Sequence, residues 1–279
     1  PNAIERERER LGLNDPLVVQ YWDWLSAAAT GDLGESYAER EPVTEMIRRS
    51  LWRTVQLIFW GILISAIVAI SIGVYGAVRQ YSIADYTFTG LSFVGLSMPP
   101  FWFAFIAIQF LVFTVTDWFN LDEPLFYFVG LQSVDDSSVL NYARHLFLPV
   151  ATLTVQIIAS WSRYQRSSML DAMSSDYIRT AKAKGVPRRK VIYKHGLRNA
   201  LIPLVSVAAI DIGLLFGGLI ITERIFSMPG MGSMFLVALG NGDTPVLLGW
   251  TLVVGTMVIL FNLLADLLYG VLDPRVRLQ

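Results

Sequence analysis

The sequence contains no cysteine and only two histidines, His145 and His195, among its 279 residues. Disulfide bonds and thiolate sites are therefore excluded, and a histidine-rich metal site is not expected. Charged residues are also scarce, at 16% of the chain, whereas 54% of the residues are hydrophobic and the mean hydropathy is +0.49. This composition excludes an ordinary soluble domain and indicates a protein that lies mostly within a membrane.

Five apolar stretches are predicted to cross the bilayer, which takes about 20 residues of helix. Charged or glycine- and proline-rich connections separate these stretches, which comprise residues 54–78, 86–115, 146–162, 201–221 and 246–272. We therefore predict an all-α, polytopic integral membrane helix bundle. Residues 1–53 are expected to form an external segment with amphipathic helices, and residues 54–279 to form the transmembrane domain.

The first three predicted spans contain residues that bear on helix packing. Small residues recur at every fourth position of the first span, which predicts a face that packs against another helix: Gly61, Ser65, Ala69, Gly73 and Ala77. In the second span, Pro99 and Pro100 remove two backbone donors and predict a break or a kink of the helix, either beside a pore or purely structural. In the third span, Pro149 is expected in the first turn, where proline costs least.

Basic residues concentrate in one connection, the basic loop of residues 163–203. It holds ten of the 22 lysines and arginines: Arg163, Arg166, Arg179, Lys182, Lys184, Arg188, Arg189, Lys190, Lys194 and Arg198. The positive-inside bias places residues 163–198 in the cytoplasm, together with Arg79 and the C-terminal Arg275 and Arg277.

Alternation of the spans then fixes the other connections. Residues 116–145, residues 222–245 and the N-terminal segment are expected outside the membrane. An external N-terminal segment without a signal peptide would be difficult to translocate across the membrane. A sixth span upstream of residue 1 is therefore also expected.

The basic loop is predicted to fold into two short helices. Apolar side chains recur there at helical spacing: Met169, Leu170, Met173, Tyr177 and Ala181. Gly185 suits the left-handed position that ends a helix, and Pro187 can open a second helix that runs to about Asn199. The first helix could insert into a groove on a partner protein, whereas a basic segment could also lie on anionic lipid. The small residues before Gly185 favour a protein partner because they permit close backbone contact.

This loop resembles the EAA loop of ATP-binding-cassette (ABC) importer permeases, in the form found in the dipeptide/oligopeptide (peptide/nickel) family. The matching stretches are residues 176–185 and 195–203, in which residues 179–181 replace the general Glu-Ala-Ala and Gly185 occupies the motif's glycine. Residues 195–198 depart from the general Ile-x-Leu-Pro, as they do in the peptide/nickel branch. Other stretches resemble the family's B-type subunit in order and spacing, namely residues 11–16, 20–21, 31–36, 226–232 and 273–277.

The resemblance implies a type I importer permease fold and a subunit that is not an enzyme and binds no cofactor by itself. Because the sequence lacks a G-x-x-x-x-G-K-[ST] phosphate loop, ATP and Mg are expected on partner subunits. The implied partners are a second homologous permease, two ATP-binding subunits and an external substrate-binding protein, with peptides as cargo and a prokaryotic inner or plasma membrane as the location. Nucleic acid is not an expected partner. The residues implied in ATPase coupling are Asp176, Tyr177, Arg179, Thr180, Ala181, Ala183, Lys184, Gly185, His195, Leu197, Arg198 and Asn199.

Three polar residues inside the predicted spans join Pro99 and Pro100 as candidates for the pathway or for packing. Asp211 lies about 15 Å into its span, where it could contact a peptide's amino group or make an interhelical hydrogen bond. Asn262 and Asp266 share one face of the last span and are expected to fix helix packing or to meet a loop base. An ion-coupled secondary transporter that uses Asp211 stays open as the alternative function. A membrane hydrolase is not expected, because no histidine is well placed beside a nucleophile.

Overall fold

The structure, a computed structural model, describes residues 5, 14–133, 136, 138–217 and 219–272. In this part of the chain the secondary structure is helical, apart from an isolated bridge between Glu35 and Pro42. Five of the described helical segments are long and apolar enough to cross a membrane: Val43–Val78, Pro100–Phe119, Val139–Ser174, Arg188–Leu215 and Thr244–Leu268. The predicted all-α membrane bundle is therefore confirmed, although several span boundaries differ from those predicted.

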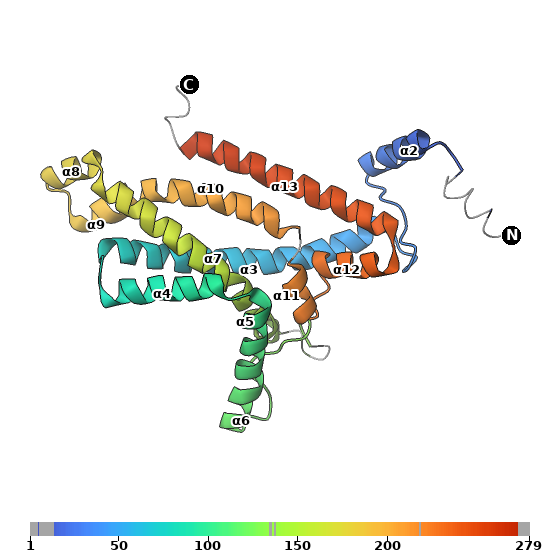
Figure 1. Cartoon of the computed structure of the whole chain (residues 1–279), viewed down its shortest axis with the longest axis horizontal. Coiled ribbons are helices and arrows are strands. Elements are labelled where there is room, and N and C mark those ends of the chain that lie inside the picture. Colours follow the sequence, from blue (N-terminus) through green and yellow to red (C-terminus); the bar gives the residue numbers. More distant parts are fainter. Residues whose placement is uncertain (1–4, 6–13, 134–135, 137, 218, 273–279) are drawn as a thin grey trace.

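Helices α3 (Val43–Val78) and α7 (Val139–Ser174) pack closely together at the centre of the bundle (Figure 1). The small-residue face of α3 is buried, and a Cβ atom placed on Gly73 would lie 2.7 Å from the Cβ atom of Gln165 in α7. The prediction that this face packs against another helix is confirmed. Helix α3 begins directly after Pro42 rather than at the predicted Thr54, because the charged residues that precede Thr54 continue the same helix.

The prediction of a single span over residues 86–115 is wrong. Helix α4 (Ile83–Ser97) lies beside α3, and the chain then turns sharply into α5 (Pro100–Ala107), η1 (Ile108–Thr114) and α6 (Val115–Phe119) (Figure 1). The backbone at the turn is extended, with ψ values of 118° at Met98 and 138° at Pro99. Pro100 is the first residue of α5, where its missing donor leaves no helical bond unmade. Of the two predicted effects of the prolines, a break or a kink, the structure shows the break.

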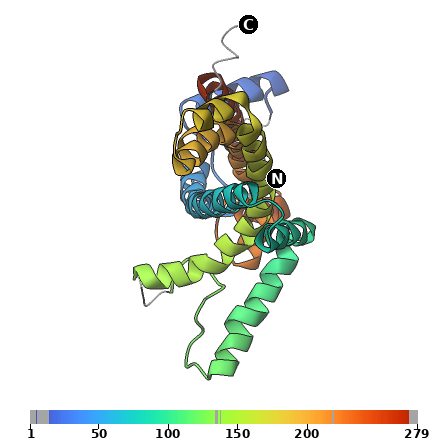
Figure 2. The ribbon, with the colours of Figure 1, turned by 90° about the vertical axis from the view of Figure 1, so that its left-hand side faces the viewer.

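The expected start of the third span is also wrong. Helix α7 begins at Val139, where the Ser138 side chain accepts a hydrogen bond from the Asn141 backbone N–H, so Pro149 lies inside the helix rather than in its first turn. The charged Arg144 and His145 suggested a connection, but His145 is buried and helical. The ribbon of α7 bends in its first half (Figure 2), as expected for an interior proline.

The remaining helices complete the bundle and the basic loop. They are α2 (Leu17–Ala29), α8 (Asp176–Ala183), α9 (Arg188–Lys190), η2 (Val191–Leu197), α10 (Arg198–Leu215), α11 (Ile220–Ile225), α12 (Met231–Asn241) and α13 (Thr244–Leu272). Helix α13 lies along α10, and a Cβ atom on Gly213 would be 3.0 Å from the Cβ atom of Phe261. The second helix of the basic loop was predicted to end before the next span, but α9, η2 and α10 follow one another without a break. Residues 188–198 contain no proline, and their one glycine, Gly196, lies within η2 and does not end the helix. The C-terminal stretch 273–277 lies outside the described residues.

Candidate functional site

Helix α8 is a short amphipathic helix at the basic end of the bundle, which is the end that carries α8, α9 and η2 (Figure 1). Its inner face is formed by Ile178 and Ala181, which are buried with Val191 of η2. Five of the proposed coupling residues point away from this small core and are exposed: Asp176, Tyr177, Arg179, Thr180 and Ala183. Ala181 is turned inward, so among the small residues only Ala183 and Gly185 are free to approach a partner closely.

The C-terminus of α8 is closed by a pair of backbone hydrogen bonds. The Val186 N–H donates to the Ala181 carbonyl at 3.1 Å, and the Gly185 N–H donates to the Lys182 carbonyl at 3.0 Å. Gly185 has φ +73°, the left-handed conformation predicted from the sequence. This arrangement is a Schellman motif, and Val186 packs on the same small core as Ala181. The end of α8 is thus fixed in place while its outer face stays open.

The second group of predicted coupling residues lies where η2 joins α10. His195 and Leu197 are half-buried, whereas Arg198 and Asn199 are exposed. A Cβ atom placed on the intervening Gly196 would lie 3.0 Å from side-chain atoms of Met169 and Met173 in α7. This close approach holds the second half of the basic loop against α7, so α7 carries both halves of the loop.

Three polar contacts connect α7 to α4 along their common length. The Gln156 side-chain amide donates to the Met98 carbonyl at 3.1 Å, and the hydroxyls of Ser162 and Ser92 lie 3.3 Å apart. Nearest to α8, Arg166 makes two hydrogen bonds of 2.8 Å with the Asp85 carboxylate. These contacts, which we call the α4–α7 ladder, extend from the basic loop to the turn at Pro99.

The Asp85–Arg166 ion pair was not predicted from the sequence. Asp85 is 3% exposed and also accepts a hydrogen bond from the Tyr81 N–H. Gly76 of α3 lies against both partners, since a Cβ atom there would be 2.8 Å from Asp85 Oδ1. The order Ser82-x-x-Asp85 is a helix-start signal, and Ser82 does cap α4. That signal marks the helix start but gives no indication of a partner 81 residues away.

The polar residues predicted inside the spans do not gather into one site. Asp211 Oδ2 accepts a hydrogen bond of 2.7 Å from Trp161 Nε1, which joins α10 to α7. Asn262 and Asp266 are exposed on α13, and Pro99 and Pro100 lie at the turn between α4 and α5. Within the described ranges, no group of three or more His, Cys, Asp or Glu residues could hold a metal ion.

The opposite end of the bundle contains a buried carboxylate that was also not predicted. Glu223 of α11 is 1% exposed, accepts a hydrogen bond of 2.6 Å from Thr54 Oγ1, and accepts another of 2.9 Å from the Ser233 N–H. Burial raises the pKa of the Glu223 carboxyl, while hydrogen bonds from Thr54, Ser233 and Gly232 oppose that rise. The carboxylate therefore binds the first turn of α12 and fixes it to α3.

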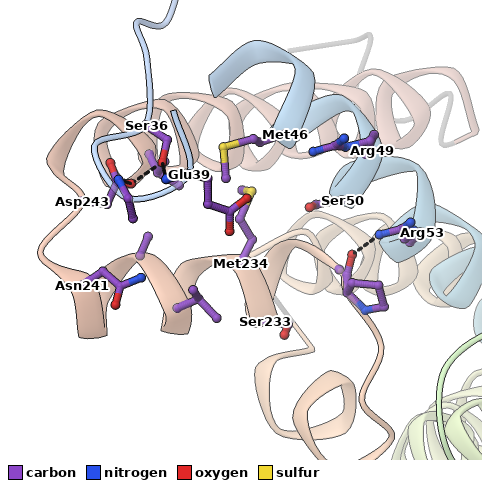
Figure 3. Close-up of a pocket in the computed structure, with 16 residues that line it drawn as sticks. Ser36, Glu39, Met46, Arg49, Ser50, Arg53, Ser233, Met234, Asn241 and Asp243 are labelled. Carbon is purple, nitrogen blue, oxygen red and sulfur yellow. Dashed lines mark hydrogen bonds between the residues drawn. The ribbon is translucent and has the colours of Figure 1, made fainter. Parts of the chain in front are cut away.

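A pocket of about 260 Å³ lies beside this carboxylate, between the loop at residues 36–39, the start of α3 and α12 (Figure 3). Arg49, Arg53 and Glu39 supply charged groups to its lining, and Met46 and Met234 supply apolar ones, with Glu39 lying between the two methionines (Figure 3). Arg53 donates a hydrogen bond to the Pro229 carbonyl at 3.3 Å, and Asp243 accepts one from Ser36. The mixed lining suits the binding of polar or amphipathic groups.

Comparison with known proteins gives concordant sequence and structural matches. Residues 55–278 match the family of binding-protein-dependent transport system inner membrane components. The chain is 38% identical to the oligopeptide transport system permease protein AppB of Bacillus subtilis, covering 99% of this chain and 86% of that protein. It is 40% identical to the dipeptide transport system permease protein DppB of Escherichia coli K12, covering 96% and 83%.

The structural comparison agrees with the sequence matches. The inward-facing MetNI methionine ABC transporter contains a chain that superposes with a TM-score of 0.61 at 17% identity, covering 82% of this chain and 96% of that chain. At this identity the likeness shows the fold alone, which is the type I importer permease fold expected from the EAA-like loop. The chain therefore belongs to the family of binding-protein-dependent transport system inner membrane components, the permeases of ABC importers.

Proposed function

We propose that the chain is the permease subunit of an ATP-driven importer of dipeptides or oligopeptides, and that it forms half of the translocation pathway. The residues of α8 bind a cytoplasmic ATPase subunit, and the ATPases hold the ATP and Mg that this chain does not bind. A second homologous permease completes the pathway, and an external substrate-binding protein delivers the peptide. The basic loop and the C-terminus lie on the cytoplasmic side of a prokaryotic inner membrane.

The observation that supports coupling most strongly is the combination of an open outer face and a fixed attachment of α8. Its exposed face provides a surface for a groove on the ATPase, while Ile178 and the Schellman motif anchor it to the chain. A displacement of α8 by the ATPase would pass to α7 and, through the α4–α7 ladder, toward Pro99. Such a transfer is a two-state coupling, in which nucleotide favours one arrangement of the helices.

The alternative of an ion-coupled transporter based on Asp211 has less support. A proton or cation site needs a carboxylate that is free to exchange its partner, but Asp211 accepts a hydrogen bond from Trp161. That transporter would also leave α8 without a role. Uptake that is lost with a proton ionophore but survives ATP depletion would overturn the proposed function.

The direct test is purification of the tagged chain from its native membranes. Two ATP-binding subunits and a second permease are expected to co-purify, and ATP hydrolysis is expected to rise when a peptide-loaded binding protein is added. Recovery of the chain alone, in a form that still transports peptide after reconstitution, would contradict the proposal.

Substitution of Gly185 tests the role of α8. Gly185→Val is expected to reduce peptide uptake about tenfold, because a β-branched residue at φ +73° costs about 1–2 kcal/mol and unwinds the end of α8. No atom lies within 4 Å of a Cβ atom at this position, so backbone conformation rather than lack of space causes the loss. The measurement is uptake and ATP hydrolysis by the complex in proteoliposomes.

The matched control is Gly185→Asn, because asparagine tolerates the left-handed conformation. This variant is expected to keep most of the uptake, and both variants should insert into the membrane to the same extent. Equal uptake by the valine and asparagine variants would show that the α8 terminus does not matter for coupling.

Asp211→Asn separates the two roles considered for that residue. The asparagine side-chain oxygen can still accept the Trp161 hydrogen bond, so stability should change by about 1 kcal/mol or less and uptake of di- to tetrapeptides should be retained. Trp161→Phe, which removes the donor, is expected to be the more destabilising change. A selective loss of uptake in Asp211→Asn with an unchanged Tm would instead indicate that Asp211 contacts the peptide.

A further inference from the structure

A second groove, separate from α8, runs along α3 at the basic end. It has a volume of about 400 Å³ and lies where the last turns of α3 meet η2. Its apolar lining consists of Ile70, Val74, Val78, Ile192 and Leu197. One of its lining residues, Leu197, is a predicted coupling residue, but none belongs to α8, so docking of the ATPase on α8 leaves the groove without a function.

The groove changes from apolar to cationic along its length. Ile70, Val74 and Val78 follow one another at one-turn intervals on α3, and Arg79 stands at the end of the helix. The distance from Ile70 to Arg79 is about 13 Å at the helical rise, comparable with a substantial part of one bilayer leaflet. The Arg79 guanidinium lies 5.5 Å from the ring of Tyr75, which also lines the groove. The apolar part therefore lies deeper in the membrane, and the positive charge of Arg79 lies where α3 ends.

More positive charge adjoins the mouth of this groove. A neighbouring cavity of about 440 Å³ is lined by Arg189, Lys190, Tyr193 and Lys194, and Tyr193 lines both cavities. All four of these residues are exposed, as is Arg79. Within the part of the chain that the structure describes, no carboxylate lies at ion-pair distance from Arg79, Lys190 or Lys194. The cations at the mouth thus lack a negative counterpart from these residues.

We infer that this groove binds an anionic phospholipid of the cytoplasmic leaflet. One acyl chain lies against Val74 and Ile192, and the phosphate lies among Arg79, Lys190 and Lys194. Tyr193 stands between the two parts, at the level where tyrosine is enriched in membrane proteins. This assignment rests on the proposed function for its orientation, which places the basic end in the cytoplasm.

The sequence of an apolar part followed by a cationic part along the groove favours a phospholipid over other anions. A free phosphate would gain nothing from an apolar wall, and a zwitterionic phospholipid would gain little from several unpaired cations. An acyl chain and a negative headgroup satisfy both parts at once. The two interpretations of the basic loop then apply to different segments, with α8 binding the ATPase and the stretch from Arg189 to Lys194 binding lipid.

The test is a binding titration on the purified transport complex in neutral detergent. Labelled dioleoyl phosphatidylglycerol is the ligand, and unlabelled dioleoyl phosphatidylcholine and glycerol 3-phosphate are the competitors. Arg79→Gln combined with Lys194→Gln is expected to weaken phosphatidylglycerol binding about 25-fold, or about fivefold for each cation. Ser71→Trp, which fills the exposed apolar part of the groove without removing charge, is expected to weaken binding as well.

The control is Arg48→Gln, which removes an exposed cation near the other end of α3 and should leave phosphatidylglycerol affinity unchanged. Effective competition by phosphatidylcholine, or by glycerol 3-phosphate at equal concentration, would overturn the lipid assignment. Loss of the second permease from the Ser71→Trp complex would overturn it too, because the groove would then be a subunit interface. Co-purification of the ATPases is measured separately, on the wild-type complex. Absence of the ATPases would contradict the proposed function, whereas unchanged phosphatidylglycerol binding in the variants would contradict only the lipid site.

Discussion

Gly230→Ala is expected to prevent accumulation of the folded permease. A Cβ atom at residue 230 would lie 2.3 Å from Glu223 Oε1 and 2.6 Å from Thr54 Oγ1, both of which are buried. The two side chains cannot move aside cheaply, because Thr54 also accepts a hydrogen bond from the Met231 N–H and Glu223 also accepts one from the Ser233 N–H. Each buried polar group left without a partner costs about 1–3 kcal/mol, so the two side chains together cost about 2–6 kcal/mol, which overlaps the lower end of the stability of a typical domain, about 5–15 kcal/mol.

The measurement is the yield and Tm of the tagged complex after size-exclusion chromatography. Gly240→Ala is the matched control, since it makes the same change on α12 where no atom lies within 4 Å of the new Cβ atom. It is expected to be neutral or slightly stabilising, because alanine favours a helix by about 1 kcal/mol over glycine. Similar yields of the two variants would show that the Glu223 network does not hold α12 in place.

The features that follow from composition and local pattern were predictable from the sequence. Five apolar stretches were predicted, and five described segments are long and apolar enough to cross a membrane, although the second begins only at Pro100. The small residues from Gly61 to Ala77 identified the face of α3 that packs on α7. Gly185 was assigned a left-handed conformation, which its φ of +73° confirms. Each of these features is set by residues close together in the sequence: by composition, by a repeat along one helix or by a single turn.

The features that depend on distant pairs were not predictable. Charge at Arg144 and His145 suggested the end of a helix, but burial of His145 in the fold outweighs that local signal. Pro99 and Pro100 were expected to break or bend a helix within one span, whereas the turn at Met98 and Pro99 separates two helices that point in different directions. Glu223 and Asp85 gave no sign of being buried, because their partners Thr54 and Arg166 lie 169 and 81 residues away.

Disruption of the Asp85–Arg166 ion pair is expected to separate ATP hydrolysis from peptide uptake. Arg166→Gln leaves the Asp85 carboxylate almost fully buried without its charged partner. Loss of one partner costs about 3–5 kcal/mol in a fully buried pair, and the 30% exposure of the Arg166 side chain reduces the effect to about 2 kcal/mol. That value corresponds to a shift of about 30-fold between two arrangements of α4 and α7. ATP hydrolysis should persist while uptake falls by about tenfold or more, measured side by side in proteoliposomes.

Two further variants distinguish coupling from simple loss of stability. Arg166→Lys keeps the charge but not the paired hydrogen bonds, so it is expected to restore part of the uptake per ATP hydrolysed. Glu45→Gln breaks the Glu45–Arg48 pair on the surface of α3, where an exposed pair is worth less than about 1 kcal/mol, and should change neither activity. If hydrolysis and uptake instead fall together in Arg166→Gln, in proportion to the amount of folded complex, the ion pair only stabilises the fold. A fall in uptake alone, partly reversed by lysine, would identify Asp85 and Arg166 as positioning residues through which movement of α8 reaches α4.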